Sequence, residues 1–393
     1  MKKSTVIVSI ILLFLLSMNT AIFAEEAEKN GQEPLNLAPE AESAILMERD
    51  TGEILFDKNA EEKLPPASMT KVMTLLLIME QLENGNLTYE ETVRVSERAA
   101  SMGGSQIFLE EGEEMTVEDL LKGVAIASGN DASVALAERI SGSEDAFVKK
   151  MNEKVKELGL KNTKFQNATG LPADDHYSTS YDMAMIAKEL LKYESITEYT
   201  SIYEDYLRKG EENEFWLVNT NKLVKFYPGV DGLKTGFTNE AKYCLTATAE
   251  KNDMRVITVV MGAETTKERN AAISQMLDYA FNHFETKKLF DKGQTITNLQ
   301  LLKAENKDID IVASESISTL HPKGESMDDI TTEVEFFPDI TVPLKKGDQV
   351  GTLYVKKGED ILSESDLTVD HDIDKASYYT FFKRSMQKLL KSE

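Results

Sequence analysis

Two side chains near the start of the chain have the types and the spacing for nucleophilic catalysis. Ser68 and Lys71 lie three residues apart in Pro65-Pro66-Ala67-Ser68-Met69-Thr70-Lys71, and residues three apart share one face of a helix. A serine hydroxyl becomes a nucleophile when a neighbouring base takes its proton, and a neutral lysine can be that base. This pair is therefore the first candidate for a catalytic site.

The surrounding sequence predicts a helix that protein encloses. The two prolines hold the preceding chain extended, a helix begins at about Ser68, and Gly85 can end it in a left-handed C-cap. An unpaired ammonium group is rarely buried, so Lys71 must be paired or neutral at such a place. Apolar residues fall on nearly every side of the first two turns: Met69, Val72, Met73, Leu75, Leu76, Leu77, Ile78 and Met79.

The Ser-x-x-Lys spacing alone is not specific, because Ser385-Met386-Gln387-Lys388 also matches it. The order of three motifs is more informative. Ser68-x-x-Lys71 is followed by Ser128-Gly129-Asn130, between two predicted helices, and by Lys234-Thr235-Gly236, on a predicted strand. Each motif lies in the structural context that its role in acyl transfer requires.

These residues form a consistent set for acyl transfer. None of the four histidines lies in a recognisable nucleophile motif, which leaves Lys71 as the better base. Burial and the positive charge of Lys234 would both lower the pKa of Lys71. Ser128 can relay a proton to a leaving amine, and Asn130 can hydrogen-bond a substrate amide. Gly236 leaves room for an extended peptide at the strand edge.

Hydrophobic periodicity predicts the fold that holds these motifs. The fold class is α/β (α+β): an antiparallel sheet packed by helices, with an all-helical block inserted between its strands. A small all-β domain follows. The predicted elements are a hairpin over 43–56, helices over 116–126, from 130, over 144–158, after 179 and over 267–284, and strands over 230–237, 243–249 and 255–261. The predicted N-caps are Thr116, Asn130 or Asp131, and Thr179.

The two ends of the chain have their own signals. Lys2 and Lys3, an apolar run and Ala24 predict a signal peptide over 1–24, although retention as an anchor stays open. Residues 25–40 form a flexible lead, 41–287 the catalytic domain and 288–370 the β-rich domain. Residues 371–393 combine aromatic and basic residues on helical faces, which favours a membrane surface over packing on the protein itself.

The chain resembles the low-molecular-mass penicillin-binding proteins that act as serine-type D-Ala-D-Ala carboxypeptidases. The resemblance covers nearly the whole chain. Besides the three motifs it rests on Thr51-Gly52-Glu53, Asn167-Ala168-Thr169-Gly170-Leu171-Pro172 and Asp231-Gly232-Leu233, on the β-rich second domain and on the amphipathic tail. It implies a serine β-lactamase/transpeptidase-like fold and removal of the terminal D-alanine from peptidoglycan stem peptides through an acyl-enzyme on Ser68.

The resemblance also implies roles for further residues. The backbone N–H groups of Ser68 and Phe237 would bind the oxyanion. Lys234, Thr235 and Arg269 would bind the substrate's terminal carboxylate, although a solvated helix residue remains the alternative for Arg269. Members of this family often carry histidine at the position of Phe237. Because the backbone N–H group would bind the oxyanion, this difference affects fine tuning by the side chain and not the reaction itself. The resemblance implies no metal and no cofactor.

The implied partners are stem peptides that end in D-Ala-D-Ala, β-lactam antibiotics and a membrane surface contacted by the tail. A net charge of −24 argues against a nucleic-acid partner. Cys244 is the single cysteine of the chain, so an exported protein of this sequence forms no internal disulfide; we expect a small buried side chain there. The predicted location is the outer face of the bacterial cytoplasmic membrane and the cell wall.

Two alternatives are open at this point. A class A β-lactamase shares the three motifs but adds Glu-x-x-x-Asn, which does not occur between Asn130 and Lys234. A non-catalytic wall-binding protein would keep the fold without the chemistry. The presence of every expected polar group argues against that second alternative.

Overall fold

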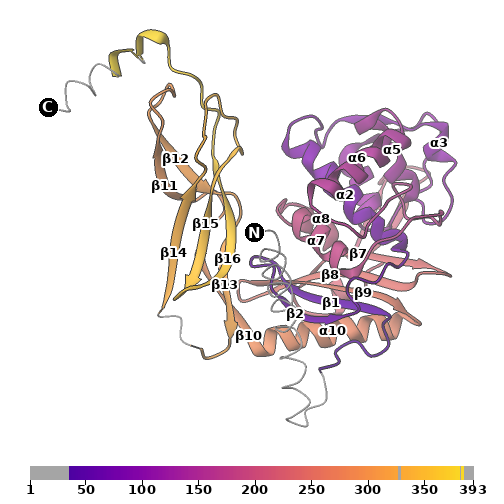
Figure 1. The fold of residues 1–393 in the computed structure, drawn as a ribbon. Coiled ribbons are helices and arrows are strands. Elements are labelled where there is room, and N and C mark those ends of the chain that lie inside the picture. Colours follow the sequence, from indigo (N-terminus) through magenta and orange to yellow (C-terminus); the bar gives the residue numbers. More distant parts are fainter. Residues whose placement is uncertain (1–34, 326–328, 381, 385–393) are drawn as a thin grey trace, which may run out of the picture.

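The computed structural model describes residues 35–325, 329–380 and 382–384. The predicted signal peptide and residues 385–393 of the predicted tail lie outside the described residues. Figure 1 shows a catalytic part, in which helices stand on a sheet, and a second part made of long strands. Within the described ranges, no helix is both long enough and apolar enough to cross a membrane.

The central sheet is antiparallel and has the strand order β2-β1-β9-β8-β7. Its strands are β1 (Ser43–Glu48), β2 (Ile54–Lys58), β7 (Val230–Thr238), β8 (Lys242–Lys251) and β9 (Met254–Ala263). The predicted hairpin and the three consecutive strands are therefore confirmed. Strand β7 pairs with β8 on one side only, so its other edge is not paired within the sheet.

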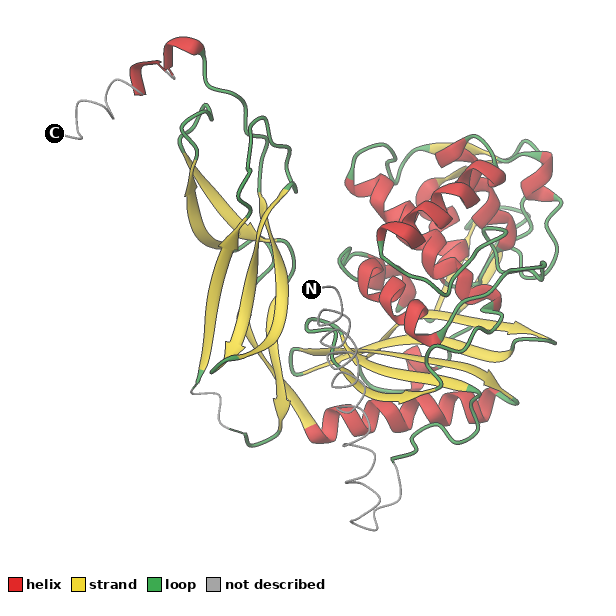
Figure 2. Cartoon of the chain, in the orientation of Figure 1, coloured by secondary structure: helices red, strands yellow, loops and turns green. Residues whose placement is uncertain are grey.

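Helices cover both faces of this sheet (Figure 2). Helix α10 (Thr266–His283) packs on one face and buries a core with Leu245, Val256 and Met276. On the other face lies α2 (Lys71–Glu83), preceded by a 3₁₀ turn, η1 (Ala67–Thr70). Gly85 adopts φ +69°, the left-handed conformation predicted for the end of this helix. Every residue from Lys71 to Met79 is buried, as the all-round apolar pattern indicates.

The inserted block is mainly helical. Its helices are α3 (Glu97–Ala100), α4 (Val117–Ala125), α5 (Asn130–Ser141), α6 (Glu144–Glu157), α7 (Ser180–Leu190), α8 (Ile196–Thr200) and α9 (Leu223–Phe226). It also contains two small sheets that the periodicity did not reveal, β3 (Thr92–Arg94) with β4 (Glu114–Thr116) and β5 (Glu204–Leu207) with β6 (Phe215–Val218). The side chains of Thr116 and Thr179 cap α4 and α7 as predicted.

One predicted helix cap is wrong. We expected Asn130 or Asp131 to cap α5, but Gly129 holds the cap position and no side chain caps the helix. The Asp131 carboxylate instead accepts hydrogen bonds from the backbone N–H groups of Ile107 and Leu109 at 3.0–3.1 Å. The carboxylate fixes a neighbouring loop, a long-range use of aspartate that local sequence cannot show.

The second part consists of strands β10 (Phe284–Phe290), β11 (Thr295–Gln300), β12 (Asp308–Ala313), β13 (Ile317–Pro322), β14 (Ile330–Phe336), β15 (Gln349–Lys357) and β16 (Asp360–Val369). They form a five-stranded sheet of order β11-β12-β16-β15-β14 and a pair β10-β13. This arrangement confirms the predicted all-β character. Strand β10 begins directly at the end of α10 (Figure 1), so the two parts are joined without a long linker.

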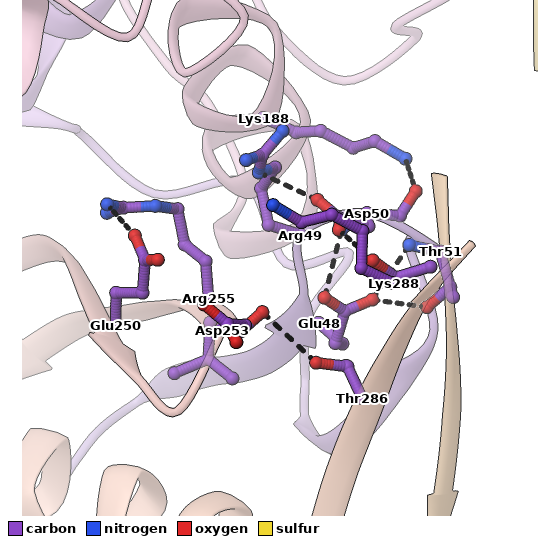
Figure 3. A network of polar contacts seen from close by, with 12 residues as sticks. Glu48, Arg49, Asp50, Thr51, Lys188, Glu250, Asp253, Arg255, Thr286 and Lys288 are labelled. Atoms are coloured by element: carbon purple, nitrogen blue, oxygen red, sulfur yellow. Dashed lines mark hydrogen bonds and ion pairs between the residues drawn. The ribbon is translucent and has the colours of Figure 1, made fainter. Parts of the chain in front are cut away.

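Polar contacts tie the second part to the turn between β1 and β2 and to the turn between β8 and β9; Figure 3 labels residues of both turns. The Glu48 carboxylate accepts hydrogen bonds from the backbone and the hydroxyl of Thr51, each at 2.7 Å, and burial raises its pKa. Ser318 donates to Asp50 Oδ2 at 2.6 Å, and Thr286 donates to the Asp253 carbonyl at 3.1 Å. Asp50, directly before Thr51-Gly52-Glu53, therefore lies at the junction of the two parts.

Candidate active site

The segment that carries Ser68 lies between two glycines. A Cβ atom at Gly236 on β7 would lie 2.7 Å from the Pro66 carbonyl oxygen, and one at Gly170 would lie 1.8 Å from the Ala67 carbonyl oxygen. The absence of side chains at both positions lets the backbone on either side approach the start of η1. Pro66 and Ala67 therefore fill the side of Gly236 that a Cβ atom would occupy, and the approach of an extended peptide to this strand edge stays a prediction.

Lys71 is fully buried, and three acceptor atoms surround its Nζ. Ser68 Oγ lies at 3.2 Å, Asn130 Oδ1 at 2.6 Å and the Thr169 carbonyl oxygen at 2.7 Å. A neutral amine has two N–H groups and one lone pair. The oxygens of Asn130 and Thr169 can only accept hydrogen bonds, so each can accept one from an N–H group of Lys71. The lone pair of Lys71 then remains to accept the hydrogen of the Ser68 hydroxyl. This geometry suits a general base.

The electrostatics of the site favour the neutral form of Lys71. Burial lowers the pKa of Lys71 well below its usual value, and the charge of Lys234 lowers it further, while Asp131 acts in the opposite direction. Burial, together with the charge of Arg269, lowers the pKa of Lys234 to about 7. The cationic groups therefore destabilise one another's charged forms, which is the condition that a lysine base requires.

The loop before α5 presents Ser128 and Asn130. Asn130 Nδ2 donates to the Gly103 carbonyl at 2.6 Å, which turns its Oδ1 atom toward Lys71. Ser128 has φ +64°, and its buried Oγ has no hydrogen-bond partner among the described residues. Buried hydroxyl groups almost always have a partner. The unused capacity of Ser128 is therefore consistent with a partner supplied by a bound substrate.

Strand β7 places Lys234 and Thr235 beside Thr220. Lys234 is fully buried and donates weakly to Thr220 Oγ1 at 3.4 Å and to the Thr235 carbonyl at 3.3 Å. Thr235 Oγ1 donates to Thr220 Oγ1 at 2.8 Å. The sequence analysis did not identify Thr220, because a single threonine in a loop gives no signal of its own.

Two further candidates, Arg269 and Phe237, lie on α10 and β7. Arg269 is only 4% exposed, so the alternative of a solvated helix residue is wrong. Its Nε and Nη2 donate to Asn270 Oδ1 at 3.0 and 2.8 Å, and burial lowers its pKa to about 10. The Phe237 ring is half exposed and lies 4.5 Å from the Tyr243 ring, centroid to centroid.

A cavity of about 510 Å³ opens beside the segment of Ser68. Its walls come from Pro65–Ala67, from the stretch 170–177 and from Thr238 and Glu240, just beyond the Lys-Thr-Gly motif. It therefore lies next to the segment of Ser68 and the end of β7 at Thr238. The unpaired edge of β7 is a place where an extended peptide can form backbone hydrogen bonds.

Comparisons with known proteins show which family the chain belongs to. Residues 28–265 match the Peptidase S11 family, described as D-alanyl-D-alanine carboxypeptidase. Residues 284–375 match the penicillin-binding protein 5 C-terminal domain. The chain belongs to the D-alanyl-D-alanine carboxypeptidase family. The chain is therefore a serine-type peptidase of this family, and both its function and its two-part fold agree with the resemblance found in the sequence.

Individual relatives of this carboxypeptidase are similar over most of its length. D-alanyl-D-alanine carboxypeptidase DacF of Bacillus subtilis is 57% identical over 374 residues, 95% of each chain. The crystal structure of penicillin-binding protein 5 from Haemophilus influenzae has a TM-score of 0.67 at 31% identity, covering 88% of this chain and 100% of that one. Penicillin-binding protein D2 from Listeria monocytogenes, in its ampicillin-bound form, has a TM-score of 0.57 at 32% identity, covering 63% and 100%.

The structure of the carboxypeptidase brings Ser68, Lys71 and Asn130 into direct contact, with Lys234 close enough to lower the pKa of Lys71. Among the described residues, no hydrogen bond joins the Arg269 side chain to Ser68, Lys71, Asn130 or Lys234. The Thr169 carbonyl was missed as a ligand of Lys71, although the stretch Asn167–Pro172 had contributed to the resemblance. A backbone carbonyl carries no sequence signal, so only the fold reveals it.

Proposed function

We propose that Ser68 is the nucleophile of the carboxypeptidase and that Lys71 is its general base. The observation that carries this proposal is that Asn130 Oδ1 and the Thr169 carbonyl oxygen can accept both N–H groups of neutral Lys71, which leaves its lone pair for the Ser68 hydroxyl at 3.2 Å. Ser68 attacks the carbonyl of the penultimate D-alanine, Lys71 takes the proton, and an acyl-enzyme forms as the terminal D-alanine leaves.

The remaining groups complete the reaction. Ser128 relays the proton to the leaving amine, and Asn130 hydrogen-bonds the substrate amide. The N–H groups of Ser68 and Phe237 stabilise the oxyanion. The positive charge of Lys234 binds the carboxylate of the leaving D-alanine, assisted by Thr235 and Arg269. Water then hydrolyses the acyl-enzyme, again with Lys71 as base. The reaction uses no metal and no cofactor.

β-Lactams act at the same serine under this proposal. The Listeria relative is described as a penicillin-binding protein in an ampicillin-bound form, and this chain shares its fold. We infer that penicillin acylates Ser68 and that the acyl-enzyme persists, because the chain between Asn130 and Lys234 lacks the Glu-x-x-x-Asn carboxylate that speeds deacylation in class A β-lactamases.

One assay separates this function from its alternatives. We expect the purified protein to release D-alanine steadily from a peptide ending in D-Ala-D-Ala and to form a long-lived adduct with fluorescent penicillin. Free D-alanine is measured by coupled oxidation, and the adduct by gel fluorescence. Rapid turnover of penicillin would instead indicate a β-lactamase, and neither release nor adduct would indicate a non-catalytic wall-binding protein.

We further propose that the chain is exported after a signal peptide over 1–24, and that residues 41–287 and 288–370 are its catalytic and C-terminal domains. We also propose that the tail contacts the membrane. Tyr378, Tyr379 and Phe382 are 95%, 77% and 65% exposed. Arg384 donates to the carbonyls of Ala304 and Glu305 at 2.5 and 2.6 Å, so it holds the tail on the domain and is not available to lipid head groups.

Deleting residues 378–393 is expected to abolish binding to vesicles that contain phosphatidylglycerol, since the exposed aromatic rings and the remaining lysines are lost. Vesicle sedimentation measures binding, with both proteins starting at Glu25. D-Alanine release is expected to stay within about twofold, because the cut leaves the backbone bond from Ala376 to Lys303 intact. Replacing the three aromatic residues by serine should reproduce the deletion. Equal sedimentation of all three proteins would contradict the membrane role.

A further inference from the structure

His176 is a buried polar residue that the proposed reaction does not use. It is 8% exposed and lies in the segment 160–179, which forms one wall of the cavity beside Ser68. Its Nε2 lies 2.8 Å from Thr70 Oγ1, and its Nδ1 accepts a hydrogen bond from the backbone N–H of Gln166 at 3.1 Å. One ring therefore connects this wall to the Ser-x-x-Lys segment.

The contact with Gln166 determines the tautomer of the ring. A backbone N–H can only donate, so Nδ1 carries no proton and the proton of the neutral imidazole is on Nε2. Nε2–H then donates to Thr70 Oγ1. Burial lowers the pKa of His176 to about 4, which keeps the ring neutral at physiological pH and preserves this direction of donation. The Phe165 ring packs edge-on against it at 5.8 Å, which fixes its plane.

The bond to Thr70 is one of three that join the segment 160–179 to the helix start. Thr74 Oγ1 donates to the Ala168 carbonyl at 2.7 Å, and Lys71 Nζ donates to the Thr169 carbonyl at 2.7 Å. Thr70 lies between Ser68 and Lys71 in η1 and is fully buried. Its hydrogen bond with His176 therefore acts on the backbone between the two members of the pair.

We propose that His176 is a positioning residue that, by donating Nε2–H to Thr70 Oγ1, holds Ser68 and Lys71 at the separation needed for proton transfer. The proposal rests on the roles proposed for Ser68 and Lys71. His176 touches no reacting atom; it acts through the backbone of η1. A small misplacement of a reacting pair reduces the rate constant of the chemical step more than it reduces ground-state binding of the substrate.

Two replacements separate the two hydrogen bonds of the ring. His176→Gln keeps a donor near the position of Nε2, and His176→Asn keeps an acceptor near Nδ1 for Gln166 but cannot reach Thr70. We expect the acylation rate constant with fluorescent penicillin to fall about tenfold or more in His176→Asn and to stay within about threefold of wild type in His176→Gln. For D-alanine release, kcat should fall while KM stays within about threefold.

Thr70→Val removes the acceptor at the other end of the same bond. We expect it to reproduce the loss in His176→Asn, and the double variant to lose no more than either single variant, because both remove one interaction. Lys164→Gln, which changes an exposed lysine of the same segment, is the matched control and should behave as wild type. Thermal unfolding identifies any variant that is not folded.

Four results would overturn the proposal: wild-type acylation in folded His176→Asn, equal loss in the Gln and Asn variants, a loss confined to KM, or additive losses in the double variant. Ser68→Ala distinguishes a failure of the positioning role of His176 from a failure of the proposed function. If Ser68→Ala is inactive and His176→Asn is not impaired, His176 has no positioning role and the proposed function stands. If Ser68→Ala still forms the adduct, the proposed function fails with it.

Discussion

Ser68→Ala is expected to abolish both the penicillin adduct and D-alanine release, with a loss of at least about 10⁴-fold in kcat. The side chain that would carry the acyl group is gone. Ser68 supplies the only hydroxyl that contacts Lys71 Nζ among the described residues, since the other two contacts are with carbonyl-type oxygens of Asn130 and Thr169. Gel fluorescence and the coupled D-alanine assay measure the two losses.

The variant also has a structural control. The Ser68 hydroxyl contributes one contact to a helix start that apolar burial and backbone bonds already stabilise, so the melting temperature should change by only a few degrees. Ser385→Ala, in the second match to Ser-x-x-Lys, should keep full activity. Persistent adduct formation by folded Ser68→Ala would remove Ser68 from the mechanism.

Lys234→Gln is expected to shift the acid limb of the acylation pH profile to higher pH, by about one unit. The charge of Lys234 disfavours the protonated form of Lys71 and so lowers its pKa. Without that charge the pKa of Lys71 rises, and a smaller fraction of Lys71 is neutral at any given pH on the acid side. Burial lowers the pKa of Lys234 to about 7, so the effect operates where Lys234 is still charged.

The measurement for this prediction is the midpoint pH of the acid limb. The acylation rate at the plateau of the profile is measured separately. Loss of the carboxylate partner lowers the amplitude of the profile, whereas only the change in Lys71 shifts its midpoint. Lys225→Gln removes an exposed lysine that lies over the Tyr203 ring and should leave the midpoint unchanged. A midpoint that stays in place in Lys234→Gln would show that Lys234 does not tune the base.

The sequence predicted the parts of the site that depend on local pattern. The all-round apolar helix after Ser68, the three strands around Lys234 and the threonine caps of α4 and α7 follow from periodicity and capping rules, and the structure agrees. The order of the three motifs then indicated the chemistry. These features each depend on residues close together in the chain.

What sequence reasoning missed depends on contacts between distant segments. The Thr169 carbonyl reaches Lys71 across 98 positions, and His176 reaches Thr70 across 106. Asp131 was misassigned as a helix cap because its real partners, Ile107 and Leu109, lie more than 20 positions away. The close approach of Pro66 to Gly236 was also missed, because only the fold brings β7 beside the start of η1.

The two glycines that enclose the start of η1 limit how this enzyme could escape a β-lactam. Gly170 and Gly236 contact the backbone of Pro66 and Ala67 directly, so no side chain at either position can be accommodated without moving Ser68. A substitution there would impair attack by Ser68 on penicillin and on the D-alanine peptide alike. Drug resistance through these two positions would therefore also remove the carboxypeptidase activity.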